Sequence, residues 1–79
     1  MVRLKNIKRN NIIIECDIIP EDSVEYGHVA VNIVSGDVES YRLPKGYENR
    51  TNHVRYAKWA LLEMADSSEL PKEKLVMWY

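Results

Sequence analysis

An isoleucine-rich segment, residues 12–19, constrains the fold of this 79-residue chain more than any other feature. Most of its residues are β-branched, and such side chains favour extended strands. Successive side chains of a strand point to opposite faces, so the residues at alternate positions share one face. The face that we expect in the core comprises Ile12, Ile14, Cys16 and Ile18. The opposite face comprises Ile13, Glu15, Asp17 and Ile19.

Three further strands are predicted around this segment. Residues 2–9 alternate weakly and lead into Asn10-Asn11, two residues that tolerate positive φ, so a two-residue turn is expected to join strands 2–9 and 12–19. Pro20 to Ser23 interrupts the pairing. Strands are then predicted over 26–35 and 38–43, with a hairpin at Ser35-Gly36-Asp37 between them. Within the strand over 26–35, Val29, Val31 and Ile33 share one face.

A single helix is predicted over residues 52–67, where Thr51 or Asn52 can accept its first free amide hydrogens. It should end at residues 67–71, which include a proline. Residues 74–79 are apolar and are predicted to add a last strand to the sheet. The sequence therefore predicts one α+β domain over residues 1–79. Its antiparallel sheet has four to five strands, one helix packs on one face, and the order is β-β-β-β-α-β.

Composition indicates a cytoplasmic protein with no membrane segment. No apolar stretch is long enough to span a bilayer, the N-terminus lacks the apolar region of a secretory signal, and a lone cysteine cannot form an internal disulfide. The formal net charge is −1, but basic residues concentrate in residues 1–10 and 41–58, whereas the Asp and Glu residues of segment 11–40 have no Lys or Arg among them. If the two basic segments met in space, the molecule would have a basic side and an acidic side.

The helix is expected to have large apolar residues on its outer face as well as an apolar inner face. At about 100° per residue, its inner face gathers small and aliphatic residues, which would let the helix approach the sheet closely. The inner face comprises Val54, Ala57, Ala60, Leu61, Met64 and Ala65, with His53 at its margin. The outer face comprises Arg55, Tyr56, Trp59, Leu62, Glu63 and Asp66.

Large apolar groups on an outer helix face suggest an interaction surface. Aromatic residues beside an arginine are typical of protein–protein hot spots, so we expect a protein partner or a homodimer. The partner-binding residues would be Arg55, Tyr56, Trp59 and Leu62. An alternative is that Trp59 is buried within its own chain by the C-terminal strand, by the loop over residues 44–50 or by a rotated helix. A dimer could also form by sheet extension, through strand 2–9 or the terminal strand.

A basic rim offers a second hypothesis, in which the chain is an accessory nucleic-acid-binding domain. Cationic side chains would contact phosphates, and aromatic rings would stack on unpaired bases. The residues concerned are Arg42, Lys45, Arg50, Arg55 and Lys58. No nucleic-acid-binding motif accompanies them, and the acidic residues of segment 15–39 would repel a phosphate backbone.

Catalysis and metal binding have less support. Glu15 and Asp17 share a strand face and could act as an acid–base pair, but only if one carboxyl titrated well above its ordinary pKa. His28, His53 and Cys16 are too few for a closed zinc site, and Cys16 is expected in the core. No glycine-rich phosphate loop is present. We therefore expect no enzyme activity, cofactor, metal or small-molecule substrate.

Overall fold

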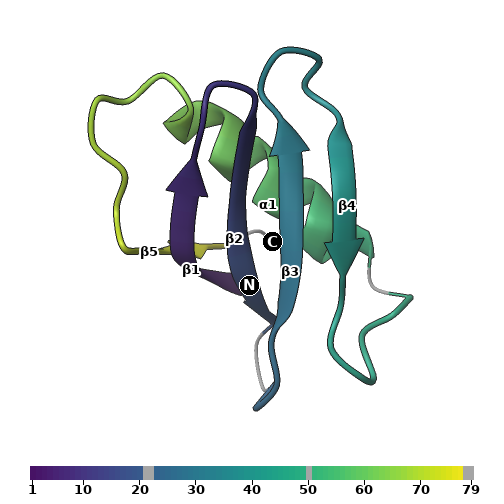
Figure 1. Cartoon of the computed structure of the whole chain (residues 1–79). Helices are drawn as coiled ribbons and strands as arrows, with labels where there is room; N and C mark the ends of the chain where they lie inside the picture. The colour runs from purple at the N-terminus through teal and green to yellow at the C-terminus, as the bar shows by residue number, and fades with distance from the viewer. Residues whose placement is uncertain (21–22, 50, 78–79) are drawn as a thin grey trace.

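A computed structural model describes residues 1–20, 23–49 and 51–77 of the chain. It contains a five-stranded antiparallel sheet with one helix across one face, which confirms the predicted α+β class and element order (Figure 1). The elements are β1 (Val2–Arg9), β2 (Ile13–Pro20), β3 (Gly27–Asn32), β4 (Val38–Arg42), α1 (Thr51–Met64) and β5 (Glu73–Val76).

The strand order in the sheet is β4-β3-β2-β1-β5. The first four strands form a meander, and the chain returns after α1 to place β5 beside β1, with Val2 opposite Val76. The predicted terminal strand therefore joins the sheet, although it covers four residues only. The part of that prediction that fell on Trp78 and Tyr79 lies outside the described residues.

The core lies between the sheet and the helix. Its buried residues come from alternate positions of β1, β2 and β3 and from the inner face of α1, as their periodicities predicted. The sheet contributes Val2, Leu4, Ile14, Cys16, Ile18, Val29 and Val31, and the helix contributes Val54, Ala57, Ala60, Leu61 and Met64. His53 is also buried, and Ala65 is half-buried at the end of the inner face.

The connection between β1 and β2 differs from the prediction. The turn falls on Asn11 and Ile12, one residue later than predicted, and neither Asn10 nor Asn11 has a positive φ. Instead, the Asn10 carboxamide oxygen accepts hydrogen bonds from the amides of Ile12 and Ile13, at 2.8 Å each. This local bonding holds Ile12 in the turn. Ile12 is consequently 55% exposed, which corrects its predicted place on the core face.

The left-handed residue of this hairpin is Asn6, with a φ of 54°. The pairing of β1 with β2 shifts between Lys5 and Lys8, which is a β-bulge. The bulge turns Ile7 onto the core, where it packs half-buried. It also explains why residues 2–9 alternate only weakly.

Strand β3 is shorter than predicted because its ends enter turns. Tyr26 lies before the strand, and Val34 beyond it is 82% exposed. The Asn32 carboxamide oxygen accepts from the amides of Val34 and Ser35, so these residues bond locally and leave the sheet. Ile33, predicted to share a face with Val29 and Val31, is half-buried against the core.

Helix α1 ends at Met64, three residues before the predicted boundary. The Arg9 guanidinium, at the end of β1, donates from Nη1 to the carbonyl oxygens of Ala65 at 2.6 Å and Ser67 at 2.7 Å. The last turn of α1 contains no basic residue of its own. A cation from β1 thus binds the free carbonyl at the end of the helix, that of Ala65, and a carbonyl of the segment that follows.

Candidate functional site

Four outward residues of α1 form what we call the helix-face cluster: Arg55, Tyr56, Trp59 and Leu62. The rings of Tyr56 and Trp59 meet edge to face, with centroids 5.1 Å apart and planes 83° apart. The Arg55 guanidinium carbon lies 5.6 Å from each ring centroid, and one of its nitrogens donates to the Asn52 carboxamide oxygen at 2.9 Å. These contacts hold the arginine against the two rings.

The helix-face cluster is accessible to a partner. Trp59 is 49% exposed, so the alternative in which Trp59 is core is not what the structure shows. Arg55 is exposed and Tyr56 is half-buried, whereas Leu62 packs partly against the core. The opposite face of the helix is buried in the core, so the helix that carries the cluster is held against the sheet.

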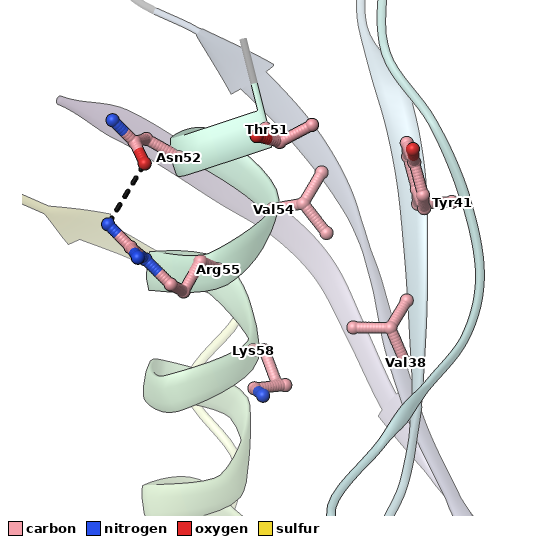
Figure 2. Close-up of a pocket in the computed structure, with 7 residues that line it drawn as sticks. All are labelled: Val38, Tyr41, Thr51, Asn52, Val54, Arg55 and Lys58. Carbon is pink, nitrogen blue, oxygen red and sulfur yellow. Dashed lines mark hydrogen bonds between the residues drawn. The ribbon is translucent and has the colours of Figure 1, made fainter.

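A groove lies beside the cluster, between α1 and the edge strand β4 (Figure 2). Helix α1 packs across β3, β2, β1 and β5 and leaves β4 largely uncovered. The groove has a volume of about 310 Å³. Its lining residues are Val38, Tyr41, Thr51, Asn52, Val54, Arg55 and Lys58. Its β4 wall, Val38 and Tyr41, was not predicted, because strand periodicity does not reveal which strand a helix leaves uncovered.

The residues predicted for nucleic-acid binding are divided between the two faces of the sheet. Arg55 and Lys58 line the groove. Tyr41 also lines it, so its neighbour Arg42 points to the open face, by which we mean the sheet face opposite α1. Lys45 lies beyond β4 next to Tyr47, and Arg50 lies outside the described residues. Of the two basic segments of the sequence, β1 is separated from the β4 end of the second by β2 and β3.

The paired carboxylates belong to a polar network on the open face. His28, on β3, has its Nε2 3.4 Å from an oxygen of Glu15 and its Nδ1 3.3 Å from an oxygen of Asp17. The other Asp17 oxygen accepts a hydrogen bond from the Asn6 carboxamide at 2.7 Å. The bulge in β1 therefore places Asn6 where it binds the carboxylate of the neighbouring strand.

This network keeps Asp17 ionised. The pKa of its carboxyl lies below the ordinary value, chiefly because Asn6 donates a hydrogen bond to the charged form. The hydrogen bond and charge of His28 and the charge of Lys8 act in the same direction, against an opposing effect of burial. A general acid requires a raised pKa, so the lowered pKa of Asp17 does not support its use as a general acid.

Cys16 lies in the core as predicted, fully buried beneath α1. Burial, followed by the charges of Asp17 and Glu15, raises the pKa of its thiol to about 12. A thiol with that pKa holds its proton at neutral pH and is a poor nucleophile. Over residues 1–20, 23–49 and 51–77, no group of histidine, cysteine or carboxylate side chains is arranged to hold a metal ion.

The helix described here is too short to cross a lipid bilayer. Comparison of the chain with protein-family models, with curated proteins and with solved structures gave no match.

Proposed function

We propose that this chain is a protein-binding module that contacts its partner through the helix-face cluster. One observation carries the proposal: a half-exposed tryptophan is held edge to face against a tyrosine, with an arginine over both rings, on the outer face of the helix. Tryptophan, tyrosine and arginine are the residues that most often dominate the binding energy of protein interfaces.

The cluster is ordered before any partner binds. Arg55 is fixed by Asn52 and by the two rings, so less side-chain entropy is lost when a partner covers it. The inner residues Ala57 and Leu61 are fully buried, which fixes the helix against the sheet. A rigid aromatic surface of this kind supports recognition of a protein.

Nucleic acid is the less favoured partner. Its predicted cations lie on different faces, and Arg42 shares the open face with Glu15 and Asp17. A phosphate backbone that approached Arg42 would meet these carboxylates.

A site-specific cross-linking experiment tests the proposal. Trp59 is replaced by the photoreactive residue p-benzoylphenylalanine in cells that express the chain, and Lys72, an exposed residue outside the cluster, is replaced in the same way as a control. We expect a discrete protein adduct from position 59 and none from position 72. The adduct's mass distinguishes a different protein from a second copy of the chain.

The adduct must then be reproduced with purified components. The partner identified by mass spectrometry should bind the purified chain, and Trp59→Ala should weaken this binding at least tenfold, whereas Lys72→Ala should change it less than twofold. Equal adducts from both positions, or equal affinity of the Trp59→Ala variant, would overturn the proposal.

A further inference from the structure

Strand β4 is an edge strand that no other described element covers on its outer side. It pairs with β3 alone in the part of the chain that the structure describes. An edge strand presents unpaired backbone N–H and C=O groups, and an extended peptide can pair with them as an additional strand. The β4 edge is therefore a backbone surface that matches a polypeptide.

The groove between β4 and α1 would receive the side chains of such a peptide. Figure 2 shows Val38 of β4 and Val54 of α1 pointing toward one another across the groove. Tyr41 stands on the same wall and is 52% exposed. A strand added beside β4 would point alternate side chains toward this face, and the groove volume of about 310 Å³ has room for one aliphatic side chain.

The rim of the groove is cationic. Arg55 and Lys58 line it, and none of the described residues that line it is acidic. The first turn of α1 also contains no acidic residue. Glu39 belongs to β4, but the Asn32 carboxamide on β3 donates to its carboxylate at 2.8 Å and holds it toward β3. A ligand that carries carboxylates therefore complements the positive charge of Arg55 and Lys58.

We propose that β4 and α1 bind an extended acidic segment of a partner protein, which pairs with the β4 edge and places one aliphatic side chain, flanked by carboxylates, in the groove. This inference rests on the proposed function and names the chemistry of the partner. Arg55 connects the two surfaces, because it belongs to the helix-face cluster and also lines the groove. A single partner would thus cover both.

A second copy of this chain fits the groove less well. Pairing between two β4 edges would bring Arg55 and Lys58 of each copy toward the same cations of the other, and like charges disfavour an interface. A short acidic segment instead brings carboxylates toward Arg55 and Lys58.

A designed peptide tests the inference. The probe has seven residues, with valine in the centre, glutamate two positions before and after it, and threonine elsewhere; it carries a fluorophore. Alternation along a strand places the valine and both glutamates on one face. Its binding to the full chain is measured by fluorescence anisotropy at peptide concentrations up to about 1 mM, and the contact is located from the backbone amide NMR shifts of isotope-labelled protein.

We expect the largest shifts at the amides of β4 and the first turns of α1. A control peptide with lysine in place of both glutamates should bind at least tenfold more weakly. Lys58→Glu should weaken binding of the acidic probe on the order of tenfold, whereas the matched variant Lys72→Glu should change it less than twofold. Two further peptides carry N-methyl groups on odd or on even residues, and only one of them should lose binding, since a strand pairs through one edge.

Three results would overturn the inference: no binding at about 1 mM, equal binding of the lysine peptide, or shifts confined to the open face. These results leave the proposed function standing if position 59 still cross-links to a partner. Failure of that cross-link would instead contradict the proposed function itself. The peptide comparison uses the unaltered protein, so it remains decisive if the Lys58→Glu variant does not fold.

Discussion

Replacement of Arg9 by alanine tests how the sheet and the helix are joined. The Arg9 Nη1 group donates to the carbonyl oxygens of Ala65 and Ser67 at 2.6 and 2.7 Å, and a longer contact reaches the carbonyl of Met64 at 3.5 Å. One nitrogen carries two N–H groups, so the two short bonds use its donor capacity. The alanine variant removes both bonds and the positive charge at the C-terminal end of α1.

The expected loss of stability is about 2 kcal/mol. Each hydrogen bond contributes about 1 kcal/mol net. A cation at a helix C-terminus contributes about 0.5 kcal/mol, and the freed carbonyls of Ala65 and Ser67 are exposed enough to bind water, which limits the cost. For a chain of this length, the melting temperature should fall by roughly 10 °C.

Urea unfolding followed by circular dichroism measures this change. Arg9→Lys keeps the charge but not the planar guanidinium, so it should lose about half as much stability as Arg9→Ala. Arg3→Ala is the control, because Arg3 is an exposed arginine of the same strand, and its cost should stay within about 0.5 kcal/mol. If Arg9→Ala were no more costly than Arg3→Ala, the guanidinium would not hold the end of the helix.

Three further predictions concern the sheet. Gly27→Ala should destabilise the chain by at least about 2 kcal/mol in urea unfolding, because an added Cβ would overlap the carbonyl oxygen of Arg42 on the neighbouring strand. An unchanged free energy of unfolding would contradict the close approach of β3 and β4. The pKa of the Asp17 carboxyl is lowered by folding, so its contribution to stability is present above the pKa of the unfolded chain and is lost as the pH falls through the folded pKa. Asn6→Gly keeps the positive φ accessible but removes the hydrogen bond that lowers this pKa most, and NMR titration should show the pKa of Asp17 rising toward its ordinary value. Cys16, with its thiol pKa raised to about 12, should react with a thiol reagent at pH 8 only after unfolding in urea, and rapid modification of the native protein would show that the core is open.

The strand faces and the inner helix face were predictable because their signals are local. Ile14, Cys16 and Ile18 alternate with Glu15 and Asp17 on β2, and burial follows that alternation. The same holds for the 3.6-residue spacing of the buried residues of α1. The element order followed from these periods together with the turn residues between them.

The irregular features were not predictable from local patterns. Asn6, Asn10 and Asn11 all tolerate a left-handed conformation, but only Asn6 adopts it. The choice depends on the pairing of β1 with both β2 and β5, which brings Asn6 to Asp17 and its amide to the carbonyl of Lys72. Such pairing is a property of the whole sheet.

The candidate site was predictable only in part. The helix-face cluster could be placed by helical spacing, because its four residues lie on one element. The groove could not, because it depends on how α1 crosses the sheet and leaves β4 uncovered. The division of Arg42 from Lys58 between two faces depends on that same crossing.

The most direct test of the proposed function is to measure stability and affinity together in Trp59→Ala. Since Trp59 is 49% exposed, the variant should lose less than about 1.5 kcal/mol of folding stability, against about 3–5 kcal/mol for a fully buried tryptophan. Its affinity for the protein cross-linked at position 59, measured by isothermal titration calorimetry, should fall at least tenfold. A variant that unfolds would show that Trp59 serves the fold, and one that binds this partner as tightly as the unaltered chain would show that Trp59 takes no part in recognition.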